Sequence, residues 1–276
     1  MRTIALVVAA IAAVWGAITD AFDAGSGAVA TEAADRGVQY DPAADCDLAT
    51  IESLSTQHPD VDQFVVMATA SWTATVGTVE VAARGPGGTW LCQRPAMTAM
   101  YGRSGTRPLL DRRSGDGTTP AGVFPLGEVT AWDGEVFSMF GNSPDPGVLV
   151  PYRDVRPEDC WGATKNTARY QHLVNRYRCP GPDDEWLAGV TESYSHAAVI
   201  GANLDPISGD EPGEIPYAAA IFLHRYSYSS NGVAKPTSGC VSLGYDDLVA
   251  TLRLIDPALN PHFAIGPTDY LRREGL

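Results

Sequence analysis

The chain has 276 residues, of which 45% are hydrophobic, so it can bury a substantial core and general disorder is not expected. Its formal net charge of -14 at pH 7 argues against binding to nucleic acid or anionic lipid, since both partners are themselves negative. No run of Lys or Arg exceeds two residues, so no local basic patch offsets this charge.

The first 30 residues have the pattern of an export signal. They contain one Arg, an uncharged run from Thr3 to Thr19, and small residues that end in the A-x-A of Ala28 and Ala30. We expect cleavage after Ala30. A short membrane anchor is the alternative, because the uncharged run is near the lower length limit for crossing a bilayer. Either way the functional part is predicted to be secreted or in the cell envelope, tethered only if this segment is retained.

Cysteine usage agrees with an exported protein. The five cysteines are Cys46, Cys92, Cys160, Cys179 and Cys240, so at most two disulfides form and at least one thiol is left over. Cys160 and Cys179 enclose a polar, aromatic segment that a bridge would fix, with about 3 kcal/mol for a loop of that size. Cys46 and Cys92 bracket the first strand-rich region and form our second predicted pair. Four cysteines permit three pairings, and this choice leaves Cys240 free.

The first third of the chain reads as a short helix followed by strands. Residues 31–60 form a polar lead-in with a short helix around 48–54. The segments 62–70 and 72–84 are rich in Val and Thr and are predicted strands. The turn-forming sequence "GPGG" follows, and then a strand at 89–92.

The remainder alternates loops, buried strands and one clear helix. Residues 97–151 are punctuated by Gly and Pro, which indicates loops and short strands. Short apolar runs at 195–205 and 218–227 are predicted buried strands. The sequence "YDDLVATLRLID" at 245–256 predicts a helix with acidic residues in its first turn, and "HFAIGP" at 262–267 a last strand.

We therefore predict a mainly β fold, a β-sandwich or mixed sheet with few short helices, one of which follows Cys240. No internal repeat or interior linker is visible, so residues 61–276 are assigned to a single domain after the lead-in at 31–60.

His224 and Cys240 are the candidate catalytic pair. A cysteine attacks an acyl group as a thiolate, and an ordinary thiol with a pKa of about 8.5 is only slightly ionised at pH 7. A histidine beside it corrects this deficit. The run "AIFLH" predicts a strand that delivers His224 at its carboxyl end, and the loop that follows, 225–236, is a candidate flap. Gly239 permits a close approach of the backbone to substrate, and the N–H groups of Gly239 and Cys240 are candidate oxyanion donors.

The simpler alternative is that each residue is structural, since a lone Cys or His usually is. Their pairing across a glycine-rich turn in an exported protein favours the catalytic interpretation. A metal site is not expected, because no C-x-x-C or H-E-x-x-H motif occurs and the remaining histidines, His58, His172, His196 and His262, have no ligand spacing.

Around these residues the sequence resembles the catalytic domain of the L,D-transpeptidases, the YkuD-like family of exported cysteine acyltransferases that cross-link peptidoglycan. The family's signature is a His, a spacer, and then Ser/Thr-His-Gly-Cys followed by a hydrophobic residue and Asn or Arg. His224 stands sixteen positions before Cys240, and Gly239, Cys240 and Val241 match. The resemblance points to actinobacterial members in particular.

Upstream segments extend the resemblance. "GRSG" at 102–105, "GDGTTPAGVFPLG" at 115–127 and "FGNSPDPGVLVPYR" at 140–153 look like parts of the same domain, so the resemblance covers roughly residues 62–267.

Three positions depart from the family's pattern. Ser238 replaces the histidine before the glycine, so an imidazole on the oxyanion side is missing. Ser242 replaces the Asn or Arg that follows the cysteine by two positions, and Arg225 follows His224 where a serine often orients the base. Thr237, Ser238 and Gly239 are expected to shape the turn.

The resemblance implies ping-pong acyl transfer on peptidoglycan stem peptides, without metal or organic cofactor. Cys240 attacks the carbonyl before the terminal D-residue, and His224 takes the thiol proton and returns it to the leaving amine. An acceptor amine or water then takes the acyl group. We expect His224 to owe its tautomer to a backbone carbonyl or to a hydroxyl such as that of Ser227.

Two other hypotheses stay open. The first is another Cys-His acyltransferase or hydrolase, either an L,D-carboxypeptidase or a sortase-like enzyme with Arg253 as its arginine; the short His-to-Cys spacing counts against the sortase. The second is a non-catalytic peptidoglycan-binding module in which Cys240 is merely buried.

Candidate substrate-binding residues are Arg225, Ser242, Tyr226 and Trp161. Trp161 lies in the segment between the paired cysteines and Tyr226 in the flap, where aromatic walls for a stem peptide are expected. Tyr170, Tyr177 and Tyr228 are further aromatic residues of these two segments, and packing is the commoner role for all of them.

Overall fold

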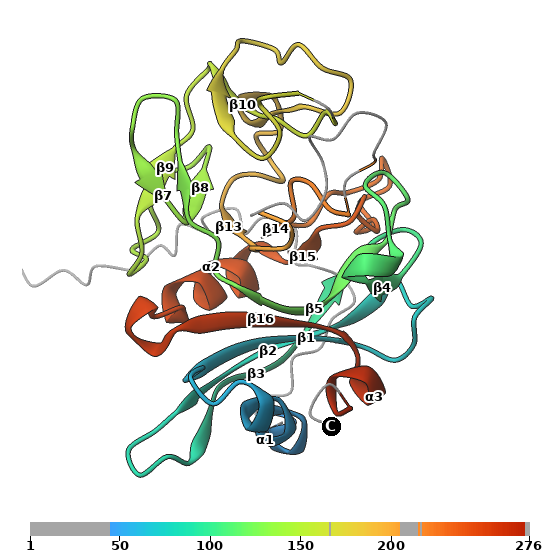
Figure 1. Cartoon of the computed structure of the whole chain (residues 1–276), viewed down its shortest axis with the longest axis vertical. Helices are drawn as coiled ribbons and strands as arrows, with labels where there is room; N and C mark the ends of the chain where they lie inside the picture. Colours follow the sequence, from blue (N-terminus) through green and yellow to red (C-terminus); the bar gives the residue numbers. More distant parts are fainter. Residues whose placement is uncertain (1–44, 166, 205–214, 216, 274–276) are drawn as a thin grey trace, which may run out of the picture. The chain divides into compact units, whose positions relative to one another are not determined.

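Extended segments rich in Val, Thr and Ala build most of the part of the chain that the structure describes. The structure is a computed structural model that describes residues 45–165, 167–204, 215 and 217–273 (Figure 1). The export signal or anchor expected at 1–30, and residues 31–44 of the lead-in, lie outside the described residues.

Within the described residues, eleven strands form one mixed sheet in the order β4-β5-β16-β1-β2-β3-β15-β14-β13-β8-β9. Its strands are β1 (Gln63–Thr69), β2 (Val76–Arg84), β3 (Trp90–Met100), β4 (Thr106–Pro108), β5 (Thr119–Pro125), β8 (Met139–Gly141), β9 (Tyr152–Asp154), β13 (Ala197–Val199), β14 (Phe222–Arg225), β15 (Val241–Leu243) and β16 (Pro261–Pro267). The prediction of a mainly β fold with a mixed sheet is confirmed at this level.

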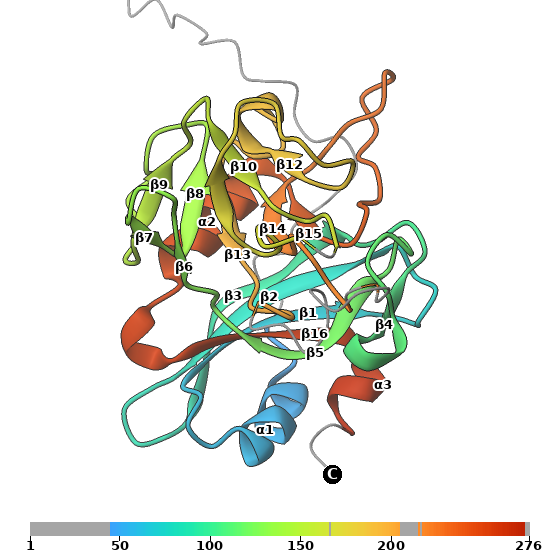
Figure 2. The same cartoon turned by 45° about the horizontal axis from the view of Figure 1, so that its top comes forward.

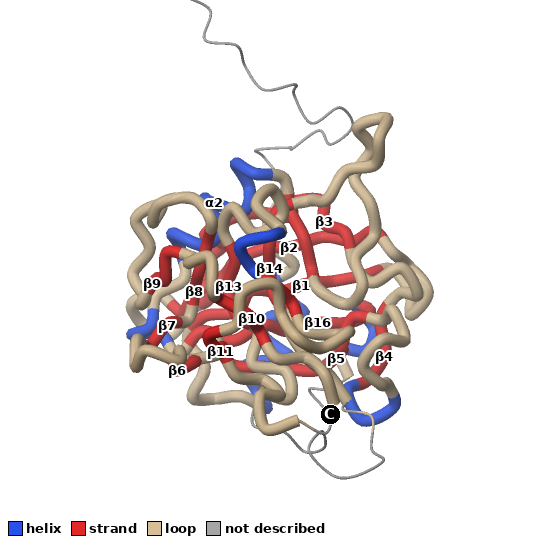
Figure 3. Tube along the Cα trace, turned by 90° about the horizontal axis from the view of Figure 1, so that it is seen from above, coloured by secondary structure: helices blue, strands red, loops and turns tan. Residues whose placement is uncertain are grey.

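Two small sheets accompany the large one. The strands β11 (Leu173–Asn175), β10 (Asp159–Trp161) and β12 (Glu185–Trp186) form the first, and β6 (Val129–Thr130) pairs with β7 (Val136–Phe137) in the second. Short 3-10 turns are η1 (Leu109–Asp111), η2 (Leu187–Gly189) and η3 (Pro257–Leu259). Much of the chain around these sheets is loop, drawn in tan in Figure 3.

Two predicted boundaries need correction. The strand expected at 89–92 runs on to Met100, because β3 pairs with β2 along most of its length across a bulge. After β16, the chain forms a short helix, α3 (Thr268–Leu271), that the sequence did not indicate.

The lead-in helix is α1 (Leu48–Gln57), where a short helix was expected. The Asp47 side chain caps it by accepting from the Thr50 N–H. Ile51 and Leu54 are fully buried in a cluster with Phe64 of β1, so α1 is packed on the sheet. Both α1 and α3 lie at the opposite end of the domain from β10 (Figures 1 and 2).

The sheet around β14 separates two hydrophobic clusters. Leu223, Val241 and Leu243 point to the face covered by α2 (Tyr245–Leu254), where Leu248 and Leu252 are fully buried. Phe222 and Cys240 belong to the other cluster, with residues of the β10–β12 sheet. The predicted helix after the cysteine is confirmed, with its acidic residues in the first turn.

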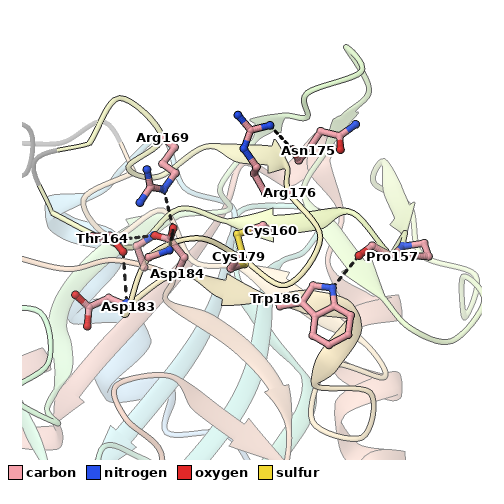
Figure 4. Close-up of a disulfide and its surroundings, with 12 residues drawn as sticks. Pro157, Cys160, Thr164, Arg169, Asn175, Arg176, Cys179, Asp183, Asp184 and Trp186 are labelled. Carbon is pink, nitrogen blue, oxygen red and sulfur yellow. Dashed lines mark hydrogen bonds and ion pairs between the residues drawn. A yellow bond between two sulfur atoms is a disulfide. The ribbon is translucent and has the colours of Figure 1, made fainter.

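The cysteines pair as predicted. Cys46 is bonded to Cys92, with a Cα–Cα distance of 5.4 Å, and Cys240 is free. Cys160 is bonded to Cys179, with a Cα–Cα distance of 5.5 Å (Figure 4). Two disulfides indicate an oxidising, extracytoplasmic environment. In the described part of the chain, no helix combines the length and the apolar character needed to cross a membrane.

Candidate active site

Cys240 is presented by a tight turn immediately before β15. The Thr237 hydroxyl accepts from the Gly239 N–H at 3.1 Å and donates to the Cys240 carbonyl at 2.6 Å, closing the turn on itself. Gly239 has φ +154°, and a Cβ there would lie 3.2 Å from the Thr118 carbonyl oxygen. Backbone freedom and close packing therefore both require a glycine, and the prediction that 237–239 shape this turn agrees with the geometry.

The Cys240 thiol is held by backbone groups of the neighbouring strand. Its Sγ donates to the Ala220 carbonyl and accepts from the Phe222 N–H, both at 3.4 Å, and 8% of the residue is exposed. Burial, and the negative charge of Glu185 nearby, raise the pKa of Cys240 to about 12. The resting thiol is therefore protonated at neutral pH.

Cys240 opens into a cavity of about 400 Å³. The charged side chains among its lining residues are Arg112, Lys165, Asp183 and Glu185. The other lining residues are small or apolar: Ser114, Gly115, Ala163, Ile215, Ala219, Ala220, Ile221, Ser238 and Gly239. A space of this size suits a peptide or other small polar substrate.

His224 lies on β14, where the sequence placed it. Its Nδ1 is 2.6 Å from the Arg225 carbonyl oxygen, which accepts the Nδ1 proton and leaves Nε2 as the basic nitrogen. Of the two partners expected for this ring, the structure selects the backbone carbonyl, and Ser227 bonds to Ser193 instead. Burial lowers the pKa of His224 to about 4, so the ring is neutral at pH 7.

His224 and Cys240 share one face of the sheet, but they are not hydrogen-bonded. His224 and Ser242 are Cα partners in the parallel strands β14 and β15, and Cys240 precedes Ser242 by two residues, on the same side. Among the described residues, the thiol contacts only Ala220 and Phe222 by hydrogen bonds, and His224 does not line the cavity. Proton transfer between them requires the thiol to turn away from the Ala220 carbonyl.

Glu185 and Tyr194 complete the surroundings of the thiol, and the sequence did not indicate either. The Tyr194 hydroxyl donates to the Glu185 Oε2, while its ring packs edge-on against His224 with centroids 5.4 Å apart. Burial raises the pKa of Glu185 to about 7, against a smaller lowering by the Tyr194 hydroxyl. Glu185 is the last of three consecutive acidic residues in a loop-rich segment, with no motif around it.

Arg112 is a further residue that the sequence did not single out. Its guanidinium donates to the Thr118 carbonyl at 2.8 Å, the Thr118 hydroxyl at 3.2 Å and the Tyr217 carbonyl at 2.5 Å. The residue is 1% exposed and lines the cavity, and its charge favours the Cys240 thiolate. Arg112 thus joins the segment before β5 to the segment before β14, directly behind the turn at Gly239.

Of the two expected oxyanion donors, one is free. The Gly239 N–H is bound by Thr237, whereas the Cys240 N–H has no hydrogen-bond partner among the described residues. Ser238 lines the cavity, and the Arg103 guanidinium donates to its hydroxyl at 3.1 Å. Ser238, which stands where the L,D-transpeptidases resembled by this sequence have histidine, therefore binds Arg103 of the "GRSG" segment.

The four expected substrate-binding residues do not line the cavity. Arg225 points to the α2 side of the sheet, where it pairs with Glu192 at 3.7 Å and stacks on Tyr245. Ser242 is fully buried. Tyr226 and Trp161 are 2% and 1% exposed and are core side chains.

Hydrogen bonds explain the burial of these rings. The Tyr226 hydroxyl donates to the Thr98 carbonyl, and the Trp161 Nε1 donates to Gln171 while its ring packs on Phe222. Tyr170 is likewise buried, with its hydroxyl on the Ala218 carbonyl. The candidate flap folds back on itself through a bridge between Tyr228 and Ala234 and projects from the domain, in orange in Figure 2.

Within the described residues, no group of three or more His, Cys, Asp or Glu side chains is placed to hold a metal ion. Comparisons with protein-family models, with the curated proteins and with the solved structures find no match to this chain.

Proposed function

We propose that the protein is a cysteine acyltransferase of the L,D-transpeptidase type, acting on peptidoglycan stem peptides, and that its mixed sheet is a version of the YkuD-like fold. The observation that carries the proposal is the setting of Cys240. It is the unpaired thiol of a disulfide-containing chain, it lies on a glycine turn at a cavity of about 400 Å³, and an imidazole occupies the same face of the adjoining strand.

In the proposed reaction, the Cys240 sulfur forms a bond to the carbonyl carbon that precedes the terminal D-residue of the donor stem. The Nε2 of His224 accepts the thiol proton and passes it to the leaving amine as the C–N bond breaks. The Cys240 N–H is the donor available to the developing oxyanion, a contribution of about 3 kcal/mol in enzymes that use such a hole. The thioester then transfers its acyl group to an amine or to water.

The resting state is an uncharged thiol beside an uncharged imidazole, because burial raises the pKa of Cys240 and lowers that of His224. Proton transfer therefore accompanies attack on the bound substrate and does not precede it. Arg112 supports this step, since its positive charge lowers the pKa of Cys240 and so favours the thiolate.

A non-catalytic wall-binding module is the second candidate. The observation that favours it is the absence of a Cys240–His224 hydrogen bond, with the thiol satisfied by Ala220 and Phe222. The sortase-like alternative gains nothing, because Arg253 donates to the Pro146 carbonyl and does not line the cavity.

Mass spectrometry of tetrapeptide-stem muropeptides, incubated with the protein and with a Cys240→Ala variant, tests the proposal. A dimer joined through third residues, absent with the variant, supports the transpeptidase. Loss of the terminal D-residue alone indicates an L,D-carboxypeptidase. Binding without any change of mass, equal for both proteins, supports the wall-binding module and rejects the enzyme.

A further inference from the structure

Glu185 is a titratable residue of the cavity that has no role in the reaction proposed for Cys240 and His224. It lies on β12, where it is the Cα partner of Trp161 on β10, and so belongs to the small sheet that covers the face carrying Cys240. Glu185 lines the cavity from the small sheet, and Cys240 lines it from the turn before β15 of the large sheet. A substrate that reaches the thiol through this space therefore lies beside the Glu185 carboxyl group.

The other charged groups around the cavity are less suited to exchanging a proton. Arg112 stays protonated and its guanidinium is engaged by Thr118 and Tyr217. Lys165 and Asp183 are exposed. Glu185 is only partly exposed, and burial brings its pKa to about 7, so it can both bind and release a proton near neutral pH.

Tyr194 lies between two titratable side chains, those of Glu185 and His224. Its hydroxyl donates to Glu185, and the edge of its ring meets His224 and Phe222, at centroid distances of 5.4 and 5.7 Å. His224 packs against this ring and does not line the cavity. An amine that enters the cavity thus meets the Glu185 carboxylate before it meets the imidazole.

We propose that Glu185 is the catalytic proton acceptor for the amine of the acyl acceptor, an inference that rests on the proposed acyltransferase function. An acceptor arrives as an ammonium ion, which cannot attack a thioester. The Glu185 carboxylate takes one proton from it, and the neutral nitrogen forms the new C–N bond as the C–S bond breaks. The second nitrogen proton passes through His224 to the departing Cys240 sulfur, and Glu185 releases its proton to solvent.

The test separates formation of the acyl-enzyme from its transfer. Intact-protein mass spectrometry measures the acyl-enzyme that forms from a tetrapeptide-stem muropeptide. The rate at which the acyl-enzyme transfers its acyl group is then measured across pH 5–9 with two acceptors. One is a second muropeptide, whose amine is an ammonium ion, and the other is hydroxylamine, which is largely uncharged at pH 7. Glu185→Gln keeps the shape of the side chain and an acceptor for Tyr194, and Glu192→Gln is the matched control on a neighbouring exposed acid.

We expect Glu185→Gln to form acyl-enzyme no more slowly than wild type, because the variant lacks the negative charge that raises the pKa of Cys240. Transfer to the muropeptide amine should be about 100-fold slower, and transfer to hydroxylamine should stay within about twofold of wild type. In the wild type, the rate of transfer to the muropeptide amine should decrease as the pH is lowered below 7. This limb of the pH–rate profile should be absent in Glu185→Gln. Tyr194→Phe removes a hydrogen bond that lowers the pKa of Glu185, so the limb should move to higher pH.

Unchanged amine transfer in Glu185→Gln would overturn the inference, and so would an equal loss of transfer to hydroxylamine, which would indicate a structural role. Absence of any acyl-enzyme in the wild type is a different result, because it removes the proposed function itself.

Discussion

His224 and Ser242 face each other as Cα partners across the parallel strands β14 and β15, and the Ser242 hydroxyl is buried without a hydrogen-bond partner among the described residues. A buried, unpaired hydroxyl costs free energy that an alanine methyl group does not. We therefore expect Ser242→Ala to raise the free energy of unfolding by about 1 kcal/mol, measured by urea denaturation.

Ser193→Ala is the matched comparison, because the buried Ser193 hydroxyl is 2.6 Å from the Ser227 hydroxyl. This variant should lose about 1 kcal/mol. Equal destabilisation in both variants would show that Ser242 has a partner in solution.

Cys240 should be a slow nucleophile towards small alkylating agents in the absence of substrate. Its pKa is raised to about 12 by burial, and the other four cysteines are in disulfides, so iodoacetamide reports on this thiol alone. At pH 8 we expect modification at least about 100-fold slower than in the urea-unfolded chain with disulfides intact, followed by intact mass. A folded-state rate within fivefold of the unfolded rate would contradict the burial of this sulfur.

Gly239→Ala should damage both stability and the site. A side chain at φ +154° is strained, and the new Cβ would meet the Thr118 carbonyl at 3.2 Å. We expect a loss of about 1–3 kcal/mol in urea unfolding, together with loss of product from stem peptides. Gly232→Ala is the control: it is also at positive φ, but nothing lies within 4 Å of its Cβ. A smaller loss in the free energy of unfolding for Gly239→Ala than for Gly232→Ala would show that the contact with the Thr118 carbonyl does not restrict position 239.

Glu185 should make the domain less stable as the pH rises. Its pKa is near 4.5 when exposed and about 7 in the folded state, so between these values the folded state holds a proton that the unfolded state has lost. The stabilising effect is fully present below about pH 4.5 and is lost as the pH passes through 7. Glu185→Gln should therefore match wild type at pH 4.5 and exceed it by about 2–3 kcal/mol at pH 8.

Urea midpoints at the two pH values measure this effect, and Glu192→Gln should show no such difference. A variant that gains nothing at pH 8 would mean that the Glu185 carboxyl is solvated in the folded state.

The local elements were largely predictable because their signals are local. A segment rich in Val and Thr predicted β1, and short apolar runs predicted β13 and β14. Acidic residues in the first turn indicated α2. The disulfide pairing chosen among three possibilities is the one that the structure shows, and each pair brackets a segment that a bridge can close.

The features that the sequence did not predict depend on contacts between segments that are far apart in the chain. The parallel pairings of β1 with β16 and of β14 with β15 leave no mark in either strand's own sequence. Glu185 enters the cavity only because β12 pairs with β10 over the face of Cys240. Trp161 and Tyr226 were expected at the cavity wall, yet their polar atoms find backbone or side-chain partners in the core.

The pairing of β1 with β16 also bears on how the chain folds. The last strand, β16, lies between β1 and β5 near one end of the large sheet. The hydrogen bonds on one edge of β1 therefore form only when β16, almost 200 residues later in the chain, pairs with it. Long loops must close before these contacts form, which is typical of slow folding. A polypeptide shortened before residue 261 would leave the edges of β1 and β5 unpaired, in the form that promotes association between chains.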